Sequence, residues 1–259
     1  MMTSRIVESL TALAREEGVR IVYACESGSR AWGFPSADSD FDVRFLYLHP
    51  PDWYLAVDLE QKRDVIDQPI NDQLDLSGWD LRKALRLFRK SNPPLLEWLG
   101  SPLVYWEQYS VAARMRQLAE TYYSPRACMY HYLHMARGNY REFLKGERVW
   151  VKKYFYVLRP LLAINWLEQG LGMAPTAFET LVAGTVTDIT LKQEIEALVV
   201  AKEAGQELDY GPRRPVLNDF IEAEMSRLET ADFNRSSPHF PVEPLNRLFR
   251  EALQEVWAS

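Results

Sequence analysis

Two short apolar runs joined by a polar loop constrain the fold of this chain more than any other feature. The first run, Ile21 to Cys25, leads into Gly28-Ser29, and the second, Val43 to Leu48, follows Asp40-Phe41-Asp42. Short apolar runs bounded by turn residues are typical of buried β-strands. Residues i and i+2 of a strand point to the same face, so we expect Asp40 and Asp42 to lie side by side.

This pair of aspartates and the Gly-Ser turn together indicate a type of chemistry. Two carboxylates held close together repel each other unless a cation or a proton lies between them. Mg²⁺ suits such a pair, because it binds through one or two carboxylates and completes its shell with water and substrate phosphates. A glycine lets backbone N–H groups approach a phosphate closely. The pattern therefore predicts phosphoryl chemistry on a nucleotide.

A third carboxylate is expected on a neighbouring strand. Two metal ions about 3.5–4 Å apart can hold the attacking and leaving oxygens of a phosphoryl transfer, and two carboxylates do not suffice for both. Asp75 fits, because Leu74-Asp75-Leu76 reads as a strand with both leucines on the opposite face. We expect Asp40 and Asp42 to bind both ions, and Asp75 to bind the ion beside the incoming hydroxyl and to take its proton. Asp72 and Asp80 are the alternatives to Asp75.

Basic side chains are expected near this site from two segments. The predicted helix 80–90 carries five Lys or Arg residues, among which Lys83 is the candidate for a phosphate contact; the alternative is a solvated basic face. Residues 126–160 hold 8 Lys/Arg against 2 Asp/Glu, whereas the chain as a whole has a net charge of −6. In this basic middle, Lys152, Tyr156 and Arg159 share a helix face that can bind a triphosphate and stack a base, unless it too is simply solvated.

The remaining sequence predicts a mixed α+β protein. A helix is expected at residues 4–17, a strand at 71–76, and almost only helices after Pro102, with one of them over 149–170. We therefore expect an α/β domain at residues 1–105 and an all-helical domain at 106–259, with the linker somewhere in 100–125. The two cysteines make no disulfide framework, and no apolar run reaches about 18 residues, so the expectation is a cytoplasmic protein without a membrane span.

The motifs together resemble a known superfamily. Gly28-Ser29, Asp40-Phe41-Asp42 and Leu74-Asp75-Leu76 are similar to the signature of DNA polymerase β superfamily nucleotidyltransferases. More narrowly, residues 20–170 resemble the nucleotidyltransferases called RNA-repair-pathway DNA-polymerase-β-family proteins. The resemblance implies a short mixed sheet with helices followed by a helical domain, a Gly-Ser turn that binds the triphosphate, and three carboxylates that bind two Mg²⁺ ions, with Mn²⁺ as a substitute. The expected nucleotide-binding residues are Gly28, Ser29, Arg30, Lys83, Lys152 and Tyr156.

Three functions are consistent with these residues. The first is Mg²⁺-dependent transfer of a nucleoside monophosphate from an NTP to a hydroxyl, with the basic middle favouring a tRNA-like RNA 3′ end as the acceptor. The second is nucleotidylation, such as AMPylation, of a protein or a small molecule, with which the sequence pI of about 5.4 is compatible. The third is a nucleotide- or RNA-binding module without turnover, which the paired aspartates disfavour because they repel phosphate without a metal.

Overall fold

The chain forms two compact units that do not follow one another simply along the sequence. The computed structural model describes residues 2–206, 208–231 and 240–258. Unit 1 comprises Met1–Ala31, Asp40–Tyr123 and His239–Ser259, and unit 2 comprises Trp32–Ser39 and Ser124–Pro238. The boundary at 105/106 stays a prediction about functional domains. The packing divides the chain elsewhere, because helices beyond residue 105 complete the core of unit 1.

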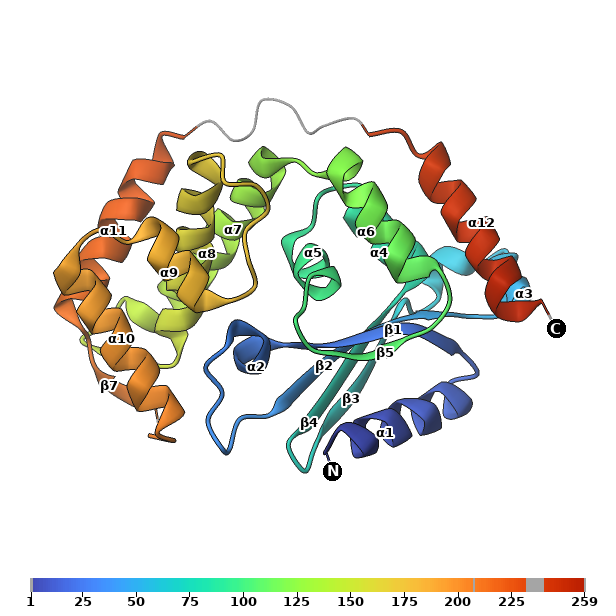
Figure 1. The fold of residues 1–259 in the computed structure, drawn as a ribbon, viewed down its shortest axis with the longest axis horizontal. Coiled ribbons are helices and arrows are strands. Elements are labelled where there is room, and N and C mark those ends of the chain that lie inside the picture. Colours follow the sequence, from blue (N-terminus) through green and yellow to red (C-terminus); the bar gives the residue numbers. More distant parts are fainter. Residues whose placement is uncertain (1, 207, 232–239, 259) are drawn as a thin grey trace. The chain divides into compact units, whose positions relative to one another are not determined.

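Unit 1 is built on a mixed five-stranded sheet, as the sequence predicted (Figure 1). Its strand order is β3-β4-β2-β1-β5, in which β2 and β4 are parallel and the other neighbours are antiparallel. The strands are β1 (Arg20–Ser27), β2 (Phe41–Leu48), β3 (Val65–Asn71), β4 (Leu74–Asp80) and β5 (Val104–Glu107).

The strand predicted at residues 71–76 lies partly across a turn. Asn71 ends β3 and pairs with Leu74, which begins β4. Between them, Asp72 and Gln73 have φ values of 45° and 66°. Two consecutive positive φ values belong to a two-residue hairpin turn of the type that matches strand twist. The sequence did not predict this turn, because the two turn residues do not include the glycine that is usual in turns of this type.

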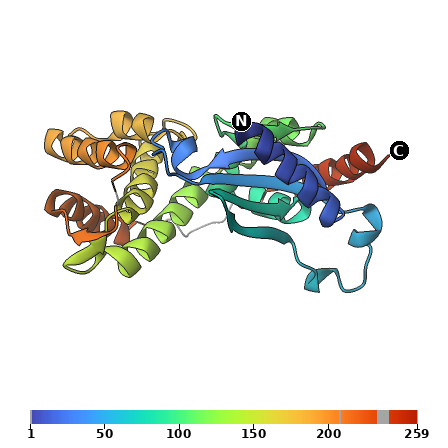
Figure 2. The ribbon, with the colours of Figure 1, turned by 90° about the horizontal axis from the view of Figure 1, so that it is seen from below.

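Helices cover both faces of the sheet in unit 1. On one face, α1 (Met2–Glu16) buries Ile6, Leu10 and Leu13 against the sheet, and Figure 2 shows this helix lying across the strands. A second core lies on the other face and includes Tyr122 and Leu248, which belong to the helices that follow residue 105. The helices of this second layer are α4 (Leu81–Phe88), α5 (Pro93–Leu99), α6 (Val111–Tyr122) and α12 (Glu243–Trp257). The short elements α2 (Gly28–Trp32), α3 (Pro51–Tyr54) and the 3₁₀ turn Leu59–Gln61 connect the strands.

Unit 2 is helical, with one small two-stranded sheet. Its helices are α7 (Pro125–Asn139), followed by a π-turn at Tyr140–Leu144, α8 (Lys153–Glu168), α9 (Phe178–Thr185), α10 (Ile189–Glu203) and α11 (Pro215–Glu229). The helix predicted at 149–170 begins only at Lys153, because β6 (Arg148–Trp150) pairs with β7 (Tyr210–Pro212). Among the described residues, no helix has the length and apolar character that crossing a bilayer requires.

Candidate active site

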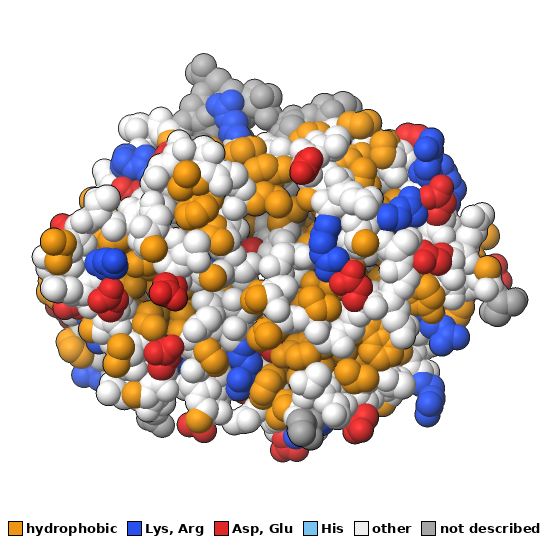
Figure 3. All heavy atoms as spheres, viewed as in Figure 1, with side chains coloured by type: hydrophobic (Ala, Val, Ile, Leu, Met, Phe, Trp, Pro, Cys, Tyr) orange, Lys and Arg blue, Asp and Glu red, His pale blue; other side chains and the backbone are white. Residues whose placement is uncertain are grey.

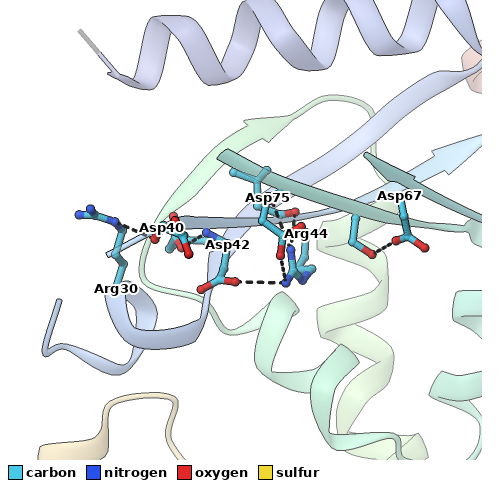
Figure 4. A network of polar contacts seen from close by, with 9 residues as sticks. Arg30, Asp40, Asp42, Arg44, Asp67 and Asp75 are labelled. Atoms are coloured by element: carbon cyan, nitrogen blue, oxygen red, sulfur yellow. Dashed lines mark hydrogen bonds and ion pairs between the residues drawn. The ribbon is translucent and has the colours of Figure 1, made fainter. Parts of the chain in front are cut away.

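Asp42 and Asp75 face each other across two neighbouring strands. In the parallel pairing of β2 with β4, Asp42 lies directly opposite Asp75. Adjacent strands lie about 4.8 Å apart, so opposite side chains on one face are neighbours. As predicted, Leu74 and Leu76 are buried on the other face, in the core with α1. Figure 4 shows the two carboxylates directed toward the same point.

The Gly-Ser turn adjoins this pair, because β1 ends where β2 begins. Ser27, the last residue of β1, pairs with Asp42 in the antiparallel β1–β2 ladder. Gly28 follows with a φ of +63°, and a Cβ added to it would lie 2.1 Å from Oδ2 of Asp42. Glycine is therefore required here twice, once by the backbone conformation and once by the carboxylate beside it. The structure thus brings Gly28, Asp42 and Asp75 together.

Arg44 lies between the two carboxylates and was not predicted. Its Nη2 donates to Oδ2 of Asp75 at 2.8 Å and to Oδ1 of Asp42 at 3.2 Å (Figure 4). Its Nη1 donates to the backbone oxygens of Val43 at 3.1 Å and Asp75 at 3.3 Å. The signal that could have found it is the i, i+2 spacing, which places Asp40, Asp42 and Arg44 on one face of a strand.

Asp40 and Arg30 lie on the opposite side of Asp42 from Arg44 in Figure 4. Asp40 directly precedes β2, and its backbone oxygen accepts a hydrogen bond from Nε of Arg30 at 3.2 Å. The Arg30 guanidinium also lies 3.7 Å from the centre of the Phe41 ring. This contact ties α2 to the start of β2, so it fixes the loop that separates the Gly-Ser turn from the aspartates.

Glu26 supports Asp42 from within the sheet and was also missed. Its side chain is 1% exposed, and its Oε1 accepts a hydrogen bond from the backbone N–H of Asp42 at 2.8 Å. Oε2 accepts a hydrogen bond from the Tyr105 hydroxyl. Burial raises the pKa of Glu26 to about 7, while the hydrogen bonds from Tyr105 and Asp42 act in the opposite direction. A carboxyl directly after an apolar run was the signal, because a buried acid needs partners.

The structure places the alternatives to Asp75, and Lys83, away from this cluster. Asp80 ends β4 and caps α4, where its Oδ1 accepts a hydrogen bond from the N–H of Arg82. Lys83 is one turn further on and pairs with Asp64 at 2.8 Å. Asp75 lies near the start of β4 and Asp80 ends it, and a strand rises about 3.3 Å per residue. Lys83, which follows Asp80, therefore lies beyond the far end of the strand from the site. Asp72 lies in the β3–β4 turn and pairs with Arg5.

The basic residues predicted around position 150 lie in unit 2, where aromatic rings surround their neighbour Lys153. Lys152 precedes α8, and the Tyr156 ring meets Trp32 edge-on at 5.4 Å. Lys153, rather than Lys152, lies over aromatic rings, 4.6 Å from the Tyr156 ring and 5.0 Å from the Trp150 ring. Burial, followed by the charge of Lys152, lowers the pKa of Lys153.

Arg159, predicted on the same face as Lys152 and Tyr156, is 3% exposed and belongs to the interior of unit 2. Part of the positive charge of residues 126–160 therefore lies in the interior of unit 2 and not on its surface. On the face drawn in Figure 3, basic side chains stand interspersed with acidic and apolar ones. The nucleotide contacts assigned to Lys152 and Tyr156 stay predictions.

A known protein resembles this chain over nearly its whole length. The uncharacterized protein YcgL of Bacillus subtilis (strain 168) is 48% identical over 257 residues, which cover 99% of this chain and 98% of that protein. A crystal structure of a nucleotidyltransferase-like protein from Exiguobacterium sibiricum 255-15 aligns with 100% of this chain and 89% of its own, at 12% identity and a TM-score of 0.32.

Residues 2–251 match the family described as RNA repair pathway DNA polymerase beta family. This description indicates a nucleotidyltransferase of the polymerase β type, in agreement with the resemblance carried by Gly28-Ser29 and the aspartates. The chain belongs to the RNA repair pathway DNA polymerase beta family.

Proposed function

We propose that this protein is an Mg²⁺-dependent nucleotidyltransferase that moves a nucleoside monophosphate from an NTP to a hydroxyl at an RNA 3′ end. The observation that carries this proposal is the meeting of Asp42, Asp75 and Gly28 at the start of β2. Phosphoryl transfer depends on positioning and charge neutralisation more than on covalent chemistry, and a divalent cation held by these carboxylates beside Gly28 would supply both.

The residues at this point fit a divalent cation. Among the described residues, no group of three or more His, Cys, Asp or Glu side chains is arranged to hold an ion. Mg²⁺ does not require such a cage, because water and substrate phosphates complete its shell around one or two carboxylates. The Arg44 guanidinium contacts both Asp42 and Asp75, which supports these carboxylates as a place for a positive charge. We propose these two as ligands on the geometry, whereas Asp40 as a third ligand and a second ion are proposed on the resemblance alone.

The proposed reaction is a single displacement at the α-phosphorus of the NTP. The oxygen of the acceptor hydroxyl forms a bond to the α-phosphorus, the bond from that phosphorus to the bridging oxygen of the β-phosphate breaks, and pyrophosphate leaves with the electron pair. The hydroxyl proton passes to a carboxylate, for which Asp75 is the candidate base. When bound, the metal neutralises phosphate charge and makes the hydroxyl more acidic. Gly28, Ser29 and Arg30 are proposed to hold the triphosphate beside Asp42.

An aromatic and basic surface of unit 2 supports RNA as the acceptor. Trp150 and Tyr210 come from the paired strands β6 and β7, and their rings are stacked with centres 6.1 Å apart. Tyr210 is 54% exposed, and Arg148 is exposed beside it and donates to its backbone oxygen. Proteins bind unpaired bases by stacking them on such rings with cations nearby. Nucleotidylation of a protein or a small molecule is the second candidate, with which the acidic composition is compatible.

A labelling experiment tests this proposal. The protein is incubated with each α-³²P-labelled NTP, Mg²⁺ and either total RNA or a cell lysate. We expect label in RNA, and we expect Asp42→Asn and Asp75→Asn each to lower the rate at least about 10²–10³-fold, since each removes charge stabilisation worth about 3–4 kcal/mol.

Asp72→Asn is the matched control, because it makes the same charge change at an exposed turn, where φ is 45° and asparagine is tolerated. Its rate should stay that of the unsubstituted protein. Label only in protein or in a small molecule would replace the RNA acceptor by the second candidate. An RNA acceptor should also bind with an affinity that falls steeply with salt. The complete absence of label would refute transfer and favour a binding module.

A further inference from the structure

We propose that Arg44 is a built-in counter-cation that competes with divalent metal for Asp42 and Asp75, so that metal binds only when its guanidinium leaves them. This inference rests on the proposed function, because it concerns the same two carboxylates. It assigns to Arg44 a positioning role that controls when the site can accept an ion.

The charges of the cluster require a cation whether or not metal is present. Two opposite carboxylates on neighbouring strands repel each other, and this repulsion falls when a positive group lies between them. Arg44 is that group, and its side chain is 19% exposed, compared with 29% for Asp42 and 25% for Asp75. All three side chains are therefore partly buried, and that of Arg44 is the least exposed of them.

The atoms that Arg44 uses are the ones that a shared metal ion would need. Nη2 alone contacts both Oδ1 of Asp42 and Oδ2 of Asp75 (Figure 4). A cation that bridges the two aspartates would meet this nitrogen and its charge. Arginine stays protonated in proteins, so the pair cannot be relieved by loss of a proton, and the side chain must move instead.

The other half of the guanidinium explains how the side chain can move without being lost from the site. Nη1 donates to the backbone oxygens of Val43 and Asp75, which carry no formal charge and do not depend on the carboxylates. These bonds give the guanidinium acceptors on the backbone while Nη2 gives up the carboxylates. Metal binding then exchanges one cation for another, instead of placing an ion between unneutralised charges.

Binding of Mn²⁺ followed by electron paramagnetic resonance tests this competition without an activity assay. Arg44→Gln removes the charge and keeps a hydrogen-bonding group. We expect it to bind Mn²⁺ at least about 5-fold more tightly than the unsubstituted protein, which is the lower end of typical coupling between two sites. Without metal, its melting temperature should fall, because the carboxylates repel, and Mn²⁺ should raise it more than in the unsubstituted protein.

Two further variants complete the experiment. Arg82→Gln makes the same change of net charge at an ion pair with Glu60, on α4, and should leave the Mn²⁺ affinity unchanged. Arg44→Lys keeps one charge on a shorter donor that cannot reproduce the guanidinium fork. Its affinity for Mn²⁺ should therefore lie between that of the unsubstituted protein and that of Arg44→Gln. It decides the question if Arg44→Gln does not fold.

The outcomes separate this inference from the proposed function. If the unsubstituted protein binds Mn²⁺, Asp42→Asn abolishes that binding and the Arg44 variants bind no more tightly, competition is overturned and the metal site stands. Weaker Mn²⁺ binding in these variants overturns it in the same way. If neither the unsubstituted protein nor Arg44→Gln binds Mn²⁺, both the metal site and the competition fail.

Discussion

Substitution of Gly28 by alanine separates the backbone role of this residue from its role beside Asp42. Its φ is +63°, and an L-residue with a Cβ in this region costs about 1–2 kcal/mol. For a unit of this size, that cost lowers the melting temperature by about 2–8 °C. The new Cβ would also lie 2.1 Å from Oδ2 of Asp42, whereas contacts below 3.0 Å essentially do not occur, so the carboxylate must move by roughly 1 Å.

The two effects of this change appear in different measurements. A carboxylate can rotate at small cost to folding, so the melting temperature should report mainly the backbone strain. A displacement of this size in a catalytic group costs about 10²-fold in rate, or about 2.7 kcal/mol. We therefore expect Gly28→Ala to lose about two orders of magnitude in nucleotidyl transfer, and also most of its Mn²⁺ binding, while the protein stays folded.

Gly18→Ala is the matched control. Gly18 follows α1 with a φ of +65°, and a Cβ there would meet no atom within 4 Å. It should lower the melting temperature, measured by circular dichroism, as much as Gly28→Ala does, and it should leave transfer and Mn²⁺ binding intact. If both variants lose the same stability and both keep activity within a few-fold, the proposed role of Gly28 in placing Asp42 is refuted.

Two other predictions concern stability at low pH and the acceptor surface. Burial, followed by the charge of Lys62, lowers the pKa of His49 to about 4, so the unfolded chain takes up a proton that the folded one does not, and stability falls as the pH drops from 6.5 to 4. In urea titrations, His49→Phe should keep the ring stacked on Trp53 and lose up to about 1.4 kcal/mol per pH unit of this dependence; an unchanged slope would contradict the assignment. Tyr210→Ala should weaken single-stranded RNA binding by about 1–3 kcal/mol in a filter-binding assay, whereas Tyr130→Ala, a 38% exposed tyrosine of α7, should not. Equal losses in both variants would remove the stacking role.

Local pattern predicted those parts of the chain in which neighbours along the sequence decide the structure. The strand Phe41–Leu48 and the helix α1 follow from apolar spacing, because burial requires one face of each element to be apolar. The same reasoning placed the Asp75 side chain on the face of the strand opposite to that of Leu74 and Leu76. Errors occurred where a partner distant in sequence decides the structure, as at β6, which is a strand because residues 210–212 pair with it.

The sequence by itself determined the family and the residue types of the candidate site, because the Gly-Ser turn and the aspartates lie in short, specific motifs. Only the tertiary structure decided which of these residues meet. Asp42 faces Asp75 because pairing between strands sets the β2–β4 register. Lys83 lies away from both aspartates and pairs with Asp64, because the length of β4 separates it from them. Arg44 and Glu26 became visible in the same way: a charged side chain is expensive to bury alone, and its partners are known only when the strands that carry them lie together.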